Sequence, residues 1–297
     1  MKILHFSDLH GDIESLKDLR KHSQTENNLE LILFTGDLLG QCLEEEQARK
    51  MYDAFYFIKN TVKTQEPVTF EQILGFLMTS IQVKQEHKRA AEFYIEAQKE
   101  FDENAEISYK KILDEIKQFP QQIFMVPGNW DSLHFHNFFR EYDLHKKSIK
   151  DKQELKIAGY GSADTIPIFI PPTRTIPFSH ERMYKFLKQG DADIVLTHIP
   201  PYTILDSTQN GSRGSLGSLA YIKTNEPDLL LCGHYHSSIG NKLDESSGTM
   251  VVNSGNLGRY EKDNYGNFSE IDYNQSEGTI TNVNHHKTKN SLIYSTP

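Results

Sequence analysis

Seven short apolar runs recur along the chain, and each ends in a polar or glycine-containing turn. They are Ile3–Ser7, Leu29–Thr35, Gln122–Pro127, Leu155–Tyr160, Asp193–Thr197, Asp228–Cys232 and Thr249–Asn253. Nearly continuous hydrophobic stretches of this length are typical of strands that are covered on both faces. Helical patterns lie between several of the runs, at Ile13–Lys21, Leu133–Arg140, Ser179–Lys188 and Leu216–Lys223. Because strands alternate with helices, the sequence predicts an α/β fold with a largely parallel sheet core.

Two segments depart from this rhythm. Near the C-terminus, Asn267–Asn274 and Gly278–Asn284 alternate like a hairpin and are predicted to add edge strands. From about residue 43 to 119 no strand signal appears, and apolar residues such as Phe70, Leu74 and Leu77 follow helical spacing. We therefore predict two or three helices inserted between two core strands, packed outside the sheets. A packing appendage, a cap over the site and a homo-oligomer interface are the alternatives for this insertion.

The bulk properties restrict the class of protein. A chain of 297 residues suits one large α/β domain, residues 1–297, with the insertion at about 43–119. The net charge of −9 provides no basic surface for nucleic acid, and it fits a small phosphorylated substrate better. No apolar run approaches the roughly 18 residues of a membrane helix. Without a secretory signal in MKILHFSDLH, and with only Cys42 and Cys232, the expected location is the cytoplasm.

Side chains that commonly bind metals follow the ends of five predicted strands. In open α/β sheets, ligands gather beyond the carboxyl ends of the strands, so we expect these side chains to meet at one edge. Within each Asp-x-His or His-x-His pair, the spacing of two residues in extended chain points both side chains the same way. We call these residues the strand-end set: Asp8, His10, Asp37, Asn129, His198, His234 and His236.

The donor types of the strand-end set predict the kind of metal centre. Seven nitrogen and oxygen donors without a thiolate exceed the roughly four groups that close a structural zinc site. With one bridging carboxylate, they suit two ions about 3.5–4 Å apart, the spacing used for phosphoryl hydrolysis. Such donors indicate two divalent transition-metal ions, with manganese, iron, zinc, nickel and cobalt all compatible.

The motifs, taken in order, resemble a known family. Asp-x-His, Gly-Asp, Gly-Asn-x-Asp, His and Gly-His-x-His together are similar to the calcineurin-like metallophosphoesterase superfamily. Three further segments, Gly159–Ser162, Thr197–Pro201 and Val252–Gly255, resemble its small bacterial and archaeal phosphoesterases. The resemblance covers the chain outside the helical insertion. It implies a four-layer αββα sandwich, into which the helical segment predicted from residue spacing would be inserted.

The resemblance also implies a reaction and its residues. One metal would be held by Asp8, His10, Asp37 and His236, and the other by Asp37 as a bridge with Asn129, His198 and His234. A metal-bridging hydroxide would attack phosphorus in a phosphodiester, phosphomonoester or phosphoanhydride of a small molecule. The residues assigned to catalysis on this basis are Asp37, Asn129, Trp130, Asp131 and His198.

One position departs from the family pattern. The family usually has Gly-Asn-His-Asp or Gly-Asn-His-Glu, and here Trp130 replaces the histidine. Indole donates one hydrogen bond and cannot act as an acid. Three interpretations follow: His134 or His136 supplies the missing acid, a metal-bound water donates the proton, or Trp130 packs against neighbours or stacks on a nucleobase. The loss also favours a second hypothesis, a non-catalytic scaffold that binds a protein partner, although such a scaffold does not need the costly polar strand-end set.

Overall fold

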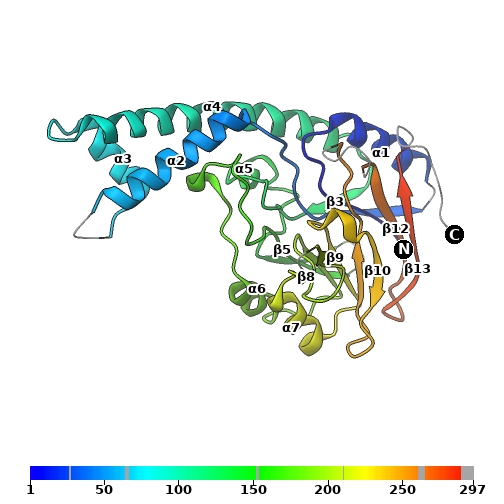
Figure 1. The fold of residues 1–297 in the computed structure, drawn as a ribbon. Coiled ribbons are helices and arrows are strands. Elements are labelled where there is room, and N and C mark those ends of the chain that lie inside the picture. Colours follow the sequence, from blue (N-terminus) through cyan, green and yellow to red (C-terminus); the bar gives the residue numbers. More distant parts are fainter. Residues whose placement is uncertain (27, 64–66, 152–153, 210, 260–264, 289–297) are drawn as a thin grey trace.

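The computed structural model describes residues 1–26, 28–63, 67–151, 154–209, 211–259 and 265–288, and residues 289–297 of the expected domain lie outside these ranges. Figure 1 shows its helices and strands. The strands are β1 (Lys2–Phe6), β2 (Leu29–Phe34), β3 (Gln122–Met125), β4 (Lys147–Lys150), β5 (Lys156–Tyr160), β6 (Ile194–Thr197), β7 (Ser207–Thr208), β8 (Gly211–Ser212), β9 (Leu229–Cys232), β10 (Gly240–Leu243), β11 (Met250–Asn253), β12 (Asn267–Asn274) and β13 (Thr279–Lys287). The α-helices are α1 (Ile13–Thr25), α2 (Glu45–Thr61), α3 (Phe70–Thr79), α4 (Gln85–Ile116), α5 (Phe135–Phe138), α6 (His180–Leu187) and α7 (Leu216–Asn225).

Two larger sheets form the centre of the fold. The first has the order β13-β12-β1-β2-β3 and the second β10-β11-β9-β6-β5-β4, while β7 and β8 make a separate short pair. Strands β1, β2 and β3 run parallel, as do β5, β6, β9 and β11, whereas β4, β10, β12 and β13 add antiparallel pairs. The parallel core and the C-terminal hairpin are therefore confirmed.

The apolar runs are continuous because each central strand is buried on both faces. On one face of β1 and β2, Ile3 and Leu31 join a core that also contains Leu196 and Leu229 of the second sheet. On the opposite face, residues such as Phe34 pack into a core shared with α1 and α4. Helices α6 and α7 cover the outer face of the second sheet with a third core, as Figure 1 shows. These four layers confirm the αββα fold.

The insertion between β2 and β3 consists of α2, α3 and α4. The C-terminal half of α4 buries Phe101, Ala105, Tyr109 and Ile112 against the first sheet. Its N-terminal half pairs with α2 and α3, which project beyond the sheets (Figure 1). The described elements between β2 and β3 are all helices. The helical spacing that starts at Phe70 ends with α3 at Thr79.

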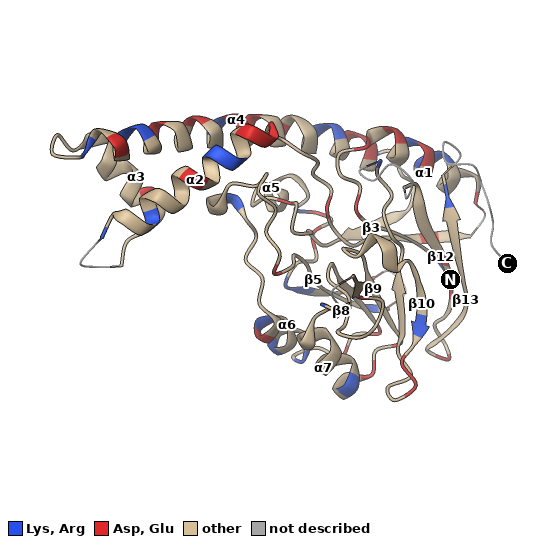
Figure 2. Ribbon diagram, in the orientation of Figure 1, with Lys and Arg blue, Asp and Glu red and all other residues tan. Residues whose placement is uncertain are grey.

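The longest helix is also highly charged. Figure 2 shows Lys and Arg interspersed with Asp and Glu along α2 and α4, without a continuous basic stripe on the side in view. Among the residues described, no helix has the combination of length and apolar composition that crossing a bilayer requires.

Candidate metal centre

The turns that follow β1, β2 and β9 have an unusual backbone. Asp8, His10, Asp37 and His234 all adopt left-handed conformations, with φ of 54°, 47°, 60° and 68°. Residues other than glycine rarely adopt such angles, and the strain concentrates at functional sites. The loops also approach closely, because a Cβ on Gly128 would lie 2.0 Å from Asp37 Oδ1. The backbone at Asp8, His10 and His234 is therefore a strained turn and not the extended chain that the spacing of two residues predicted.

One group of possible ligands consists of Asp8, His10 and His236. Each offers one ligand atom, and the three atoms lie within 4.8 Å of one another. His236 Nε2 is 3.0 Å from Asp8 Oδ1, and His10 Nε2 is 3.9 Å from the same oxygen. The Asp8 side chain is fully buried, and that of His236 is 11% exposed.

A second group consists of Asp37, His198 and His234, whose ligand atoms also lie within 4.8 Å of one another. The carbonyl oxygen of Thr35 lies 2.7 Å from His198 Nδ1 and can only accept, so Nδ1 carries a proton and Nε2 faces the group. His198 Nε2 lies 3.4 Å from Asp37 Oδ2, 3.2 Å from His234 Nδ1 and 2.9 Å from Asn129 Oδ1.

The two groups adjoin each other. His10 Nε2 lies 3.9 Å from Asp8 Oδ1 and 4.0 Å from Asp37 Oδ2, so this imidazole stands between the two carboxylates. The structure thus brings all members of the strand-end set together at one edge of the sheets. Buried nitrogen and oxygen donors of this kind fit divalent transition-metal ions.

Electrostatics prepares most of these side chains as ligands. Burial lowers the pKa of His10 and lowers that of His234 to about 4, so both imidazoles are neutral at pH 7. Burial acts to raise the pKa of Asp37, but the charge and the hydrogen bond of His198 together lower the pKa on balance and keep the carboxylate ionised. His198 is the exception: burial acts to lower its pKa, yet Asp37 raises it to about 9.

The raised pKa of His198 predicts that a proton is released when a metal ion binds. In the metal-free protein His198 is protonated at pH 7, and a metal ligand must be neutral. We therefore expect the metal affinity to rise by about tenfold per pH unit as pH increases toward 9, and to level off above it. Calorimetry in buffers with different ionisation heats measures the released proton. His198→Gln should abolish this component, and an affinity in the wild type that is constant between pH 7 and 9 would contradict the assignment.

Asp131, which the resemblance assigns to catalysis, hydrogen-bonds the backbone of the loops that carry Asp37 and Asn129. Its Oδ2 accepts hydrogen bonds from the backbone N–H groups of Gly128 at 2.8 Å and Asp37 at 3.0 Å. Its Oδ1 accepts from Leu39 N at 3.2 Å and from the Tyr109 hydroxyl at 3.0 Å. Burial raises the pKa of Asp131 to about 6, and Asp37 adds to the effect. These contacts place the Asp131 carboxylate against the backbone of the loops that follow β2 and β3.

Trp130 forms a wall beside the strand-end set. Its ring stacks on Phe169, with centroids 5.3 Å apart and an interplanar angle of 23°, and meets His10 edge-on at 5.2 Å. Its backbone N–H donates to Asp37 Oδ1 at 2.7 Å, which leaves Oδ2 of that carboxylate directed toward the imidazoles. The geometry fits the packing interpretation of Trp130.

The two histidines considered as alternative acids make other contacts. His134 Nε2 pairs with Asp102 Oδ1 of α4 at 2.8 Å, and His136 Nδ1 pairs with Asp143 Oδ2 at 2.9 Å. Neither belongs to the two ligand groups among the described residues.

The sequence did not single out Tyr109, because its only local signal is an aromatic residue at core spacing on a long helix.

Comparisons with known proteins agree with the fold. A sequence profile described as calcineurin-like phosphoesterase matches residues 1–68 and 98–238. One solved crystal structure is 17% identical with a TM-score of 0.64, covering 97% of this chain and 98% of its own. The protein TT1561 of Thermus thermophilus is 15% identical with a TM-score of 0.54, covering 97% and 98%. At these identities the likeness concerns the fold alone. No curated protein matches the chain by sequence.

Proposed function

The chain belongs to the calcineurin-like phosphoesterase family, and we propose that it hydrolyses a phosphodiester, phosphomonoester or phosphoanhydride of a small molecule with two divalent transition-metal ions. The family consists generally of metal-dependent hydrolases. The observation that carries the proposal is the pair of adjoining ligand groups, with His10 between Asp8 and Asp37.

The residues divide naturally between two ions. Asp8, His10, Asp37 and His236 would hold one ion, and Asp37, Asn129, His198 and His234 would hold the other. Asp37 suits the bridging position because its Oδ2 lies 4.0 Å from His10 Nε2 and 3.4 Å from His198 Nε2. Bound ions supply positive charge that neutralises phosphate oxygens and makes a coordinated water more acidic.

The protein's own groups hold this arrangement in place. The carbonyl of Thr35 fixes the His198 tautomer, and the N–H of Trp130 orients the Asp37 carboxylate. The stacked rings of Trp130 and Phe169 lie beside His10. Such preorganisation matters because charge builds up on the transferring phosphoryl group, where fixed groups stabilise it without rearrangement.

A substrate panel tests the proposal. The protein is reconstituted with Mn²⁺ or Zn²⁺ and assayed against nitrophenyl phosphate, bis-nitrophenyl phosphate and a nucleoside diphosphate. We expect metal-dependent hydrolysis of at least one class, lost on chelation, because the two ions supply most of the charge stabilisation. The control is His87→Ala, which removes a histidine that lies outside the strand-end set, on the projecting half of α4. This variant should remain active.

The scaffold hypothesis gives the opposite result. A protein that binds two ions and hydrolyses none of the panel, including the activated nitrophenyl esters, would favour a non-catalytic role.

A small phosphorylated substrate is the partner we propose, in line with the net charge of −9.

A further inference from the structure

We propose that Tyr109 of the inserted helix α4 is a positioning residue of the metal centre, so that docking of α4 and metal binding stabilise each other. The inference rests on the proposed function only in taking the strand-end set as a metal site. It assigns to the insertion a role that is neither a cap nor an oligomer interface.

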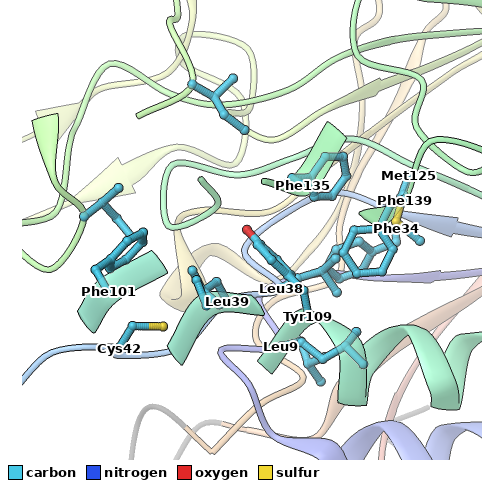
Figure 3. Close-up of a cluster of buried hydrophobic side chains, with 14 of the residues drawn as sticks. Leu9, Phe34, Leu38, Leu39, Cys42, Phe101, Tyr109, Met125, Phe135 and Phe139 are labelled. Atoms are coloured by element: carbon cyan, nitrogen blue, oxygen red, sulfur yellow. The ribbon is translucent and has the colours of Figure 1, made fainter. Parts of the chain in front are cut away.

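Tyr109 reaches the site loops from the buried side of α4. Figure 3 shows it within the apolar cluster, with its hydroxyl oxygen in red. Its ring packs against Phe138 and Phe139, with centroids 5.7 Å and 5.5 Å away. The hydroxyl donates to Asp131 Oδ1 at 3.0 Å and accepts from Ser132 N at 2.9 Å. Burial raises the pKa of Tyr109 well above its usual value, so the hydroxyl remains a donor.

Asp131 links Tyr109 to both loops that carry the proposed ligands, because it hydrogen-bonds the backbone of each loop. Its carboxylate accepts from the backbone of Asp37 and Leu39 after β2 and from Gly128 after β3. Asp37 has a left-handed backbone, with φ of 60°, which the surrounding hydrogen bonds must maintain. Among the described residues, Tyr109 is the one side chain that donates to Asp131.

Removing the hydroxyl would leave two groups poorly satisfied. Asp131 Oδ1 would keep only the longer bond from Leu39, and the N–H of Ser132 would lose its acceptor in a fully buried position. The loop that carries Asn129 would then be held less firmly against the Asp37 loop. Residues that orient metal ligands in this indirect way change metal affinity by about 10–100-fold when they are replaced.

Helix α4 also makes hydrogen bonds that do not involve Asp131, and one of these provides a control. Tyr94, also on α4, hydrogen-bonds through its hydroxyl to Thr173 Oγ1 at 2.8 Å. The Asp102 carboxylate of α4 accepts hydrogen bonds from two guanidinium nitrogens of Arg174, at 2.8 Å and 2.9 Å. Thr173 and Arg174 belong to the short 3-10 helix Pro172–Arg174 and supply no member of the strand-end set. A tyrosine hydroxyl on the same helix can therefore be removed without disturbing Asp131.

The experiment compares Tyr109→Phe with Tyr94→Phe. Zn²⁺ affinity is measured by competition with a chromophoric chelator, and unfolding of the metal-free proteins is followed in parallel. We expect the Zn²⁺ affinity of Tyr109→Phe to fall by about 10–100-fold, and that of Tyr94→Phe to remain within about threefold of the wild type. In the wild type, Zn²⁺ should also slow hydrogen exchange in the C-terminal half of α4, and Tyr109→Phe should reduce this protection.

The outcomes separate the two proposals. Unchanged Zn²⁺ affinity in Tyr109→Phe, or an equal loss in both variants, would overturn the positioning role while leaving the metal site intact. A wild-type protein that binds no Zn²⁺ would overturn the metal centre and this inference together. Zn²⁺ binding without hydrolysis of any substrate would count against the proposed function alone, because the affinity measurement uses no substrate.

Discussion

Replacing Asp37 by Ala is expected to lower the occupancy of both metal positions and to reduce hydrolysis by about 10³-fold or more. Asp37 Oδ2 faces ligand nitrogens of both groups, at 4.0 Å from His10 Nε2 and 3.4 Å from His198 Nε2. Losing a shared ligand therefore weakens both positions, and the ions contribute several kcal/mol to stabilising charge in the transition state. Elemental analysis after reconstitution, together with turnover of an activated ester, measures both effects.

Two companion variants refine this result. Asp37→Asn retains an oxygen that can accept from Trp130 N, which lies 2.7 Å from Oδ1 in the native protein, and so separates loss of charge from loss of loop structure. His198→Ala should empty mainly one position, because His198 belongs to one ligand group. Full occupancy of both positions in Asp37→Ala would rule out Asp37 as the bridge.

Replacing Trp130 by His is expected to raise turnover of alkyl phosphate esters by about 10²-fold, while nitrophenyl esters change little. A poor alkoxide leaving group needs a proton, and general acid catalysis typically contributes about 10²–10⁴-fold. A nitrophenolate departs without one. The indole lies 5.2 Å from His10, so an imidazole at this position would stand at the edge of the site. The measured quantity is the ratio of kcat values for the two substrate types.

The control for this variant is Phe169→Leu. It removes the ring that stacks on Trp130 at 5.3 Å without adding a proton donor. If loosening the wall were responsible, both variants would change the ratio alike. A ratio that stays at the wild-type value in metal-loaded Trp130→His would show that a missing acid is not the limitation. Because His134 is paired with Asp102, His134→Ala is expected to leave the ratio unchanged.

The sheets and the strand-end set could be predicted because their signals are local. A central parallel strand is apolar on both faces, so runs such as Leu229–Cys232 are visible without any partner. The ligands follow those runs directly, and the parallel arrangement carries them to one edge. Strands β4 and β10 were not predicted because KSIK and GNKL are exposed at sheet edges and contain almost no apolar signal.

The support beneath the ligands could not be predicted for the opposite reason. Asp131 belongs to a motif that marks the site, but only the fold shows its carboxylate facing backbone amides and Tyr109. Tyr109 follows Phe101 and Ala105 at ordinary helical spacing, and nothing in that pattern marks its hydroxyl. The helical character of the insertion was visible, whereas its hydrogen bonds to the site depend on contacts between residues distant in the chain.

The insertion also affects how the first sheet can assemble. Strands β2 and β3 are neighbours, with Leu31 paired to Gln122, yet the whole insertion separates them in the chain. Closing so long a segment as flexible chain costs conformational entropy before any pairing repays it. The antiparallel association of α2 with α4 uses contacts closer in sequence, such as Phe55 with Tyr94 at 6.0 Å, and can form first. The helical hairpin thereby shortens the loop that β3 must close, and ties the order of folding to the element that later supports the metal centre.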